Sequence, residues 1–192
     1  FAGAAATLER TASLLESDHG RTRQWCALMI EAGRSRLAGG DIAGDGILRE
    51  VIEIAATAGD TEMAASATLE WCRLGMSAGA GSVDDERLEV IDGLLERAPT
   101  ARERAQLGAA AAMVLSLASQ PDTLRSRYEQ AVSDAEGTDD DDLLGDVLPL
   151  AYMSTPLHED IDRRIRTGRR LQQIGAELTR PDATWEGLQL TY

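Results

Sequence analysis

The sequence predicts an all-α protein, folded as a right-handed α-solenoid of about four helix pairs. Hydrophobic residues make up 43% of the 192 residues and aromatic residues only 4%, so the core must consist largely of Ala, Leu, Ile, Val and Met. Good helix formers dominate, whereas the β-branched and aromatic residues that favour strands are sparse. Helix-start signals also recur about every 40 residues, which is typical of stacked helical repeats.

Four helix starts define the repeat, and they lie at residues 59–62, 99–103, 138–140 and 180–182. In the second of these, Thr100 and Glu103 form a capping box, because the hydroxyl can accept from the Glu103 amide while the carboxylate reaches back to the Thr100 amide. Sequence breaks fall halfway between the starts, at 39–41, 79–82, 119–122 and 154–156. Each period is therefore predicted to be helix, turn, helix.

The first helix of each pair is predicted at residues 21–38, 61–78, 101–118 and 140–153. Partner helices follow at 43–58, 83–97, 122–136 and 157–179, with a leading helix near 4–17 and a truncated one from 182. The partner helices carry apolar stripes at helical spacing, as in Leu48, Val51 and Ile52. Because no pair can bury such a stripe alone, we expect the pairs to stack into a single domain over residues 1–192.

First helices repeatedly place a glycine after an apolar residue, at Gly33, Gly75, Gly108 and Gly145. A glycine inside a helix costs about 0.5–1 kcal/mol relative to alanine, so its recurrence predicts close approach of a neighbouring helix. The segment 107–118 is apolar on nearly all faces, which predicts that its helix is the most buried one.

Charge and composition limit the classes of function. The formal net charge of −14 repels phosphate backbones and anionic membranes, so direct binding to nucleic acid or membrane is disfavoured. Cys26 and Cys72 lack the paired spacing of a disulfide framework or zinc site, and no apolar run reaches the roughly 20 residues that span a bilayer. We therefore expect a cytoplasmic protein. All 19 basic residues are Arg and neither Lys nor Asn occurs, a bias typical of GC-rich actinobacterial genomes.

The turn Leu37-Ala38-Gly39-Gly40-Asp41 resembles the tetratricopeptide repeat (TPR), whose first helix carries a small residue after a Leu and whose turn often carries Gly-Asp. Asp45 lies where that family usually has a small Ala. A wider similarity follows the order of Trp25, this turn, and the motifs at 58–60, 78–86, 94–99, 119–135 and 155–160. In this order the chain resembles the helical regions that follow the nucleotide-binding module of large actinobacterial signalling ATPases, including LuxR-type regulators and some class III adenylyl cyclase homologues.

The resemblance implies a sensor or oligomerisation arm next to a nucleotide-binding domain, often before a helix-turn-helix DNA-binding domain. The chain itself has no Walker-type Gly-Lys-Ser/Thr loop. We expect it to recognise another protein, a peptide or a small effector, with neither a cofactor nor catalysis, in a transcriptional or signalling regulator. We also expect that the chain can form a homo-oligomer. Because the first residue is Phe1 and not Met, we expect the chain to be part of a longer protein.

Aromatic side chains are the first candidate binding residues. Trp25 and Trp71 lie on first helices, where we expect them to belong to the core. The alternative is that Trp25, Trp71 and Tyr152 line a concave groove, in which rigid aromatic side chains would anchor a ligand.

Charged clusters are the second kind of candidate. A basic cluster is spread around one predicted helix and comprises Arg163, Arg164, Arg166, Arg169 and Arg170. We expect these arginines to form salt bridges to adjacent helices, and the alternative is a patch that docks an acidic segment of the same protein. The acidic run at 139–142 is predicted to be a solvated helix start, and its alternative is an acidic rim that attracts an Arg-bearing partner.

Metal-dependent chemistry has little basis in the sequence. Residues 158–159 (His-Glu) match the start of the zincin motif His-Glu-x-x-His, but Asp162 occupies the position of the second histidine. Asp41 and Asp45 faintly resemble a calcium loop, whose last ligand would be Ile52. Two alternatives to a recognition segment stay open: a freestanding TPR-type adaptor, and an α-helical enzyme or metal-binding domain.

Overall fold

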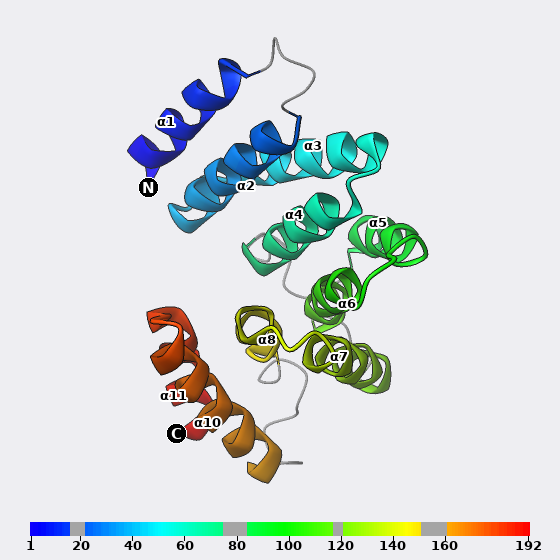
Figure 1. Cartoon of the computed structure of the whole chain (residues 1–192), viewed down its shortest axis with the longest axis vertical. Coiled ribbons are helices and arrows are strands. Elements are labelled where there is room, and N and C mark those ends of the chain that lie inside the picture. Colours follow the sequence, from blue (N-terminus) through cyan, green and yellow to red (C-terminus); the bar gives the residue numbers. More distant parts are fainter. Residues whose placement is uncertain (16–21, 75–83, 117–120, 151–160) are drawn as a thin grey trace. The chain divides into compact units, whose positions relative to one another are not determined.

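The computed structural model describes residues 1–15, 22–74, 84–116, 121–150 and 161–192, and in these ranges the chain is helical with short turns and has no strand. The prediction of an all-α protein is therefore confirmed (Figure 1). Contacts divide the chain into two compact units: unit 1 comprises Phe1–Gly81 and Asp85–Ala98, and unit 2 comprises Ser82–Asp84 and Pro99–Tyr192. The single domain over 1–192 stays a prediction.

The described residues of unit 1 form α1 (Ala2–Ser13), α2 (Thr22–Ala38), α3 (Ala43–Ala58), α4 (Thr61–Leu74) and α5 (Asp85–Leu95). Helix α2 packs against α1, α3 and α4, and α3 packs against α4. The stripe of Leu48, Val51 and Ile52 on α3 is buried, as its helical spacing predicts. Two glycines in the left-handed region, Gly40 and Gly59, with φ of 78° and 75°, follow the ends of α2 and α3.

The described residues of unit 2 form α6 (Ala101–Ser116), α7 (Pro121–Glu136), α8 (Asp141–Val147), α10 (Ile161–Glu177) and α11 (Pro181–Thr191). Helix α6 packs against α7 and α8, α8 contacts α10, and α10 packs along α11. Every residue of α6 from 105 to 115 is buried, which confirms the expected burial of this segment. None of the helices in the described ranges is long and apolar enough to cross a bilayer.

The predicted helix over 140–153 is wrong in its length, because α8 ends at Val147. Pro149 follows two residues later, and a proline there lacks the amide that would continue the helix and restricts the residue before it. Residues 151–153 lie outside the described part of the chain.

Helix caps follow the sequence signals. The Glu103 amide donates to the Thr100 hydroxyl at 3.3 Å, and the Thr100 amide donates to the Glu103 carboxylate at 2.9 Å. The capping box is thus confirmed. In the same way, the Asp140 carboxylate accepts from the amides of Asp142 and Leu143 at the start of α8.

Glycines mark close helix contacts, as expected. A Cβ on Gly33 would lie 2.8 Å from Leu48 Cγ, one on Gly108 would lie 3.1 Å from Ala131 Cβ, and one on Gly145 would lie 2.9 Å from Arg180 Nη1. These distances confirm the packing reason at Gly33 and Gly108. At Gly145 the nearest atom belongs to the guanidinium at the end of the flexible Arg180 side chain, and Gly75 lies outside the described residues.

Candidate functional site

A pocket of about 360 Å³ lies in unit 2, where the turn between α7 and α8 meets α10. Its lining residues are Glu136, Asp139, Asp141, Leu144 and Arg170. The volume is near the lower end of the range of small-ligand sites, which suits one side chain or a small molecule better than a large cofactor.

The turn before α8 positions the acidic side chains of the pocket. The Thr138 hydroxyl donates to the Ala135 carbonyl at 2.7 Å, and this contact ties the turn to the end of α7. Asp139 has a φ of 54°, a left-handed conformation that Asp adopts more readily than most residues. Asp140 then caps α8, so Asp141 begins the helix at the pocket wall, and the buried Leu144 one turn later gives the pocket its apolar side chain.

The charges of the pocket do not balance. Arg170 Nη2 lies 2.5 Å from Asp141 Oδ1, which neutralises one carboxylate. Within the described residues, the structure gives no ion-pair partner to Glu136 or to Asp139, and both are exposed. Three carboxylates and one guanidinium leave a formal charge of −2 at this site (1 − 3 = −2). A pocket of this charge attracts cations.

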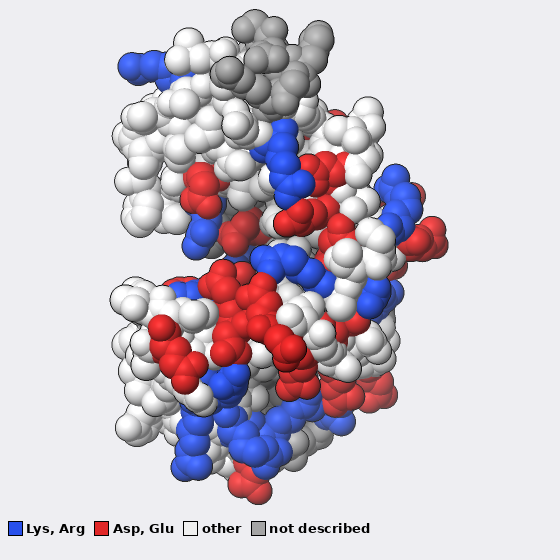
Figure 2. Space-filling model, viewed as in Figure 1, with Lys and Arg blue, Asp and Glu red and all other residues white. Residues whose placement is uncertain are grey.

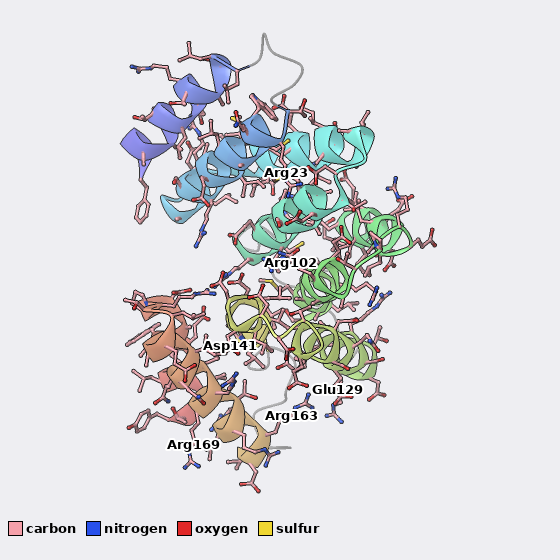
Figure 3. All side chains as sticks on the ribbon, viewed as in Figure 1. Arg23, Arg102, Glu129, Asp141, Arg163 and Arg169 are labelled. Carbon is pink, nitrogen blue, oxygen red and sulfur yellow. The ribbon has the colours of Figure 1, made fainter. Side chains whose placement is uncertain are left out.

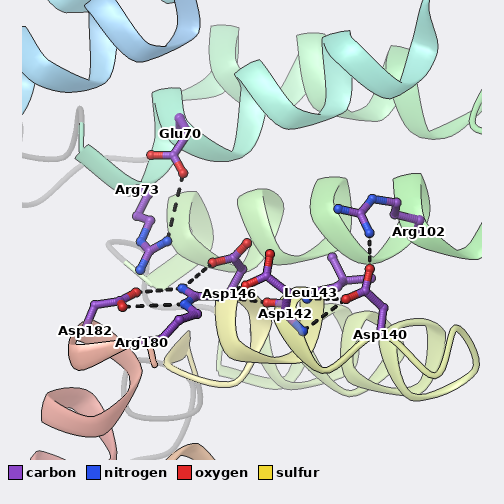
Figure 4. Close-up of polar contacts among 9 residues, drawn as sticks. All are labelled: Glu70, Arg73, Arg102, Asp140, Asp142, Leu143, Asp146, Arg180 and Asp182. Carbon is purple, nitrogen blue, oxygen red and sulfur yellow. Dashed lines mark hydrogen bonds and ion pairs between the residues drawn. The ribbon is translucent and has the colours of Figure 1, made fainter. Parts of the chain in front are cut away.

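The neighbouring carboxylates are ion-paired and have a structural role. Asp140 pairs with Arg102 of α6, and Arg180, just before α11, binds Asp142 and Asp146 at 2.8 and 2.9 Å (Figure 4). The predicted helix start at 139–142 is correct, but its carboxylates are largely neutralised by arginines of unit 2, and few of them are simply solvated. Figure 2 shows acidic side chains gathered over α8 and arginines over the first half of α10.

The pKa values of this network follow from its contacts. Burial alone would raise the pKa of Asp140, but hydrogen bonds from the Leu143 amide and the charge of Arg102 lower it overall. Burial would lower the pKa of Arg180, but hydrogen bonds and charge from Asp182 and Asp146 raise it overall. Arg180 therefore stays charged and fixed, with a side chain only 16% exposed.

The aromatic candidates lie in the core of unit 1 or outside the described residues. Trp25 and Trp71 are buried, with exposed fractions of 8% and 2%, which confirms their prediction as core residues. Tyr152 lies outside the described residues, so the groove alternative stays a prediction.

The arginines of the basic cluster on α10 differ in their contacts. Arg163 pairs with Glu129 of α7 at 2.8 Å, and Arg170 pairs with Asp141, so salt bridges to adjacent helices are confirmed for these two. Arg166 is exposed, whereas the Nε atom of Arg164 is buried without a hydrogen-bond partner among the described residues. Arg163, Arg164 and Arg166 do not line the pocket.

The sequence reasoning missed Glu136 and Leu144, and it did not separate Arg170 from its neighbours. The signal available was the acidic run after the break at the end of α7. Figure 3 shows Arg169 extending from α10 away from Asp141, although it adjoins Arg170 in sequence. Successive helical side chains point about 100° apart, so only one of the two arginines reaches the pocket.

Metal ligands do not assemble in the described ranges, where no group of three or more His, Cys, Asp or Glu side chains is arranged to hold an ion. Asp41 of the supposed calcium loop accepts from the Ala43 amide and pairs with Arg36, and Asp45 accepts from Trp71. Residues 158–159 lie outside the described chain.

The chain matches no protein-family model, and comparisons with curated proteins and with solved structures also found no match.

Proposed function

We propose that this chain is a helical recognition module that binds an arginine-bearing segment of another protein in the pocket of unit 2. The observation that carries the proposal is the excess of negative charge in the pocket, where the exposed carboxylates of Glu136 and Asp139 have no ion-pair partner among the described residues. A peptide arginine would place its guanidinium between these carboxylates and its aliphatic stem along Leu144.

We also propose that the helices stack as TPR-like pairs in a right-handed α-solenoid. Helices contact both the next helix and the next but one, as in α2 with α4 and α6 with α8, and this pattern supports the proposal. In such a scaffold the turns between helices form edges that present side chains to a partner, and the pocket lies at one such turn.

Binding should be weak and sensitive to salt. Ion pairs between exposed groups contribute about 0–1 kcal/mol each, and the Debye length falls from about 10 Å at 0.1 M salt to about 3 Å at 1 M. A site with two carboxylates that have no ion-pair partner among the described residues is suited to a reversible regulatory contact.

The test is a fluorescence-anisotropy titration with a labelled Gly-Arg-Gly-Arg-Gly peptide and its citrulline counterpart, which keeps the shape but lacks the charge. The double variant Glu136→Gln/Asp139→Asn should bind the arginine peptide about fivefold or more weakly than the unmodified chain. The double variant Asp122→Asn/Glu177→Gln removes the same charge from exposed positions of unit 2 outside the pocket and should change the affinity less than about twofold.

Two results would contradict the proposed site. One is equal binding of the arginine and citrulline peptides. The other is an equal loss of affinity in the pocket variant and in the control, because a general field effect would then explain the binding.

The resemblance to helical regions of actinobacterial regulators supports a wider proposal, that the partner belongs to the same signalling or transcriptional regulator. The open reading frame around the chain tests it. A nucleotide-binding module encoded upstream of Phe1 supports the regulator, and its absence favours the freestanding adaptor.

A further inference from the structure

The pocket already contains a guanidinium of its own. Arg170 reaches from α10 to Asp141 at the start of α8, with 2.5 Å between Nη2 and Oδ1. The side chains of Arg170 and Asp141 are 39% and 36% exposed, so water and salt screen this pair.

Arg170 and Arg180 both reach carboxylates of α8, and their environments differ. Arg180 binds three carboxylates and the Asp142 carbonyl, and its side chain is only 16% exposed. Among the residues that the structure describes, Arg170 pairs with Asp141, and its side chain has more than twice the exposure of Arg180. Releasing Arg180 would break several partly buried contacts, whereas releasing Arg170 breaks its partly exposed pair with Asp141, and such pairs contribute little to stability.

The packing of α10 does not depend on Arg170. Gly168, Leu171 and Ile174 are buried residues of this helix, and at Gly168 the backbone of α10 lies close to Gly187 and Leu190 of α11. The Arg170 side chain can leave Asp141 and enter water without moving the helix.

From this contrast we infer that Arg170 is an internal competitor, which occupies Asp141 while the pocket is empty and is displaced by the arginine of the bound partner. The inference rests on the proposed function of the pocket. The incoming guanidinium then contacts three carboxylates, those of Glu136, Asp139 and Asp141. While Arg170 is paired with Asp141, the pocket offers an incoming cation only the carboxylates of Glu136 and Asp139. Arg170 thereby sets the affinity and limits binding to cations that can take over Asp141.

The test uses the same peptide titration with Arg170→Gln, which keeps most of the stem and removes the charge. We expect this variant to bind the arginine peptide about threefold to tenfold more tightly than the unmodified chain at low salt. Arg169→Gln is the matched control, because it makes the same charge change one residue away on the exposed side of α10. It should tighten binding less than about twofold.

A second variant tests whether the gain of affinity depends on the Asp141 carboxylate. Adding Asp141→Asn to Arg170→Gln removes the group that the competitor occupied, so the gain of affinity should disappear. Far-UV circular dichroism of each variant verifies that the helices remain intact, since Asp141 lies in the first turn of α8.

The outcomes separate the two proposals. The role of Arg170 as a competitor is overturned if Arg170→Gln binds the peptide as tightly as Arg169→Gln, or more weakly. The proposed pocket is still supported in that case if Glu136→Gln/Asp139→Asn weakens binding. No binding by the unmodified chain or by Arg170→Gln overturns both.

Discussion

The indole nitrogen of Trp71 donates a hydrogen bond to the carboxylate of Asp45 at 2.8 Å and joins α4 to α3. Arg87 of α5 donates to the same carboxylate at 2.5 Å, and its guanidinium lies 4.5 Å from the centre of the Trp71 ring. One acidic side chain thus ties three helices of unit 1 together. The Asp45 carboxylate therefore has a structural role in this unit.

Asp45→Ala should destabilise the chain by about 1–3 kcal/mol, because it leaves the buried Trp71 indole without an acceptor and removes one partner of Arg87. Urea unfolding followed by tryptophan fluorescence measures the change. Glu53→Ala is the control, since Glu53 is exposed on the same helix, and its effect should stay within about 0.5 kcal/mol. A neutral effect of Asp45→Ala would contradict the structural role of this carboxylate.

Gly168→Ala should destabilise the contact between α10 and α11 by about 1–3 kcal/mol. The new Cβ would lie 2.7 Å from the Gly187 carbonyl oxygen and 3.0 Å from Leu190 Cβ, and the backbone cannot move away cheaply. Gly93→Ala offers the opposite case, because nothing lies within 4 Å of its Cβ position inside α5.

Gly93→Ala should therefore stabilise the chain by about 0.5–1 kcal/mol. Urea denaturation followed by circular dichroism compares the two variants. Effects of the same sign would contradict the helix contact at Gly168.

Thr100→Ala should cost about 0.5–2 kcal/mol, because it removes the hydroxyl that accepts from the Glu103 amide and donates to the Glu103 carboxylate. Thr123→Ala is the control at an exposed position of α7 and should stay within about 0.5 kcal/mol. The difference between their thermal unfolding midpoints measures the capping box, and equal midpoints would show that the box does not stabilise α6.

Acid should weaken unit 2 through Asp182. The hydrogen bond from Arg180 is the main cause that lowers the pKa of Asp182, although burial acts in the opposite direction. A carboxyl whose pKa is lowered in the folded state stabilises the fold above its unfolded pKa of about 3.9. That contribution is lost as the pH falls from about 5 through the folded pKa.

Asp182→Asn should therefore be less stable at neutral pH and lose less stability on acidification than the unmodified chain. Urea midpoints measured between about pH 7 and pH 3 test this, and parallel curves would contradict the role of the Arg180–Asp182 pair. In Asp182→Asn, stability should still decrease on acidification, but less steeply than in the unmodified chain. The decrease persists because the pKa values of Glu9, Asp41 and Asp140 are also lowered in the folded chain.

Much of the secondary structure was predictable because its signals are local. The predicted ranges 43–58 and 122–136 correspond to Ala43–Ala58 and Pro121–Glu136. Apolar spacing, capping side chains and turn glycines act within a few residues of each other, so each can be identified without knowing the fold. Pro149 is also a local signal, because proline disfavours the continuation of a helix, and it predicts that α8 ends before this residue.

The candidate site was predictable only in part. The acidic run at 139–142 was visible, but Glu136 and Arg170 belong to other helices, and their approach to Asp141 depends on how α7, α8 and α10 pack. Spacing alone could not separate Arg170 from Arg169, because their roles differ only in which face of α10 meets a neighbour.

The sequence by itself determined most of the helices, the capping box and the close helix contacts at Gly33 and Gly108, because backbone hydrogen bonding and side-chain periodicity are properties of short segments. The tertiary structure alone decided which carboxylates near the pocket form ion pairs and which have no such partner in the part of the chain that the structure describes. An ion pair forms only where two side chains from distant segments come within about 4 Å, and that distance is set by the packing of whole helices.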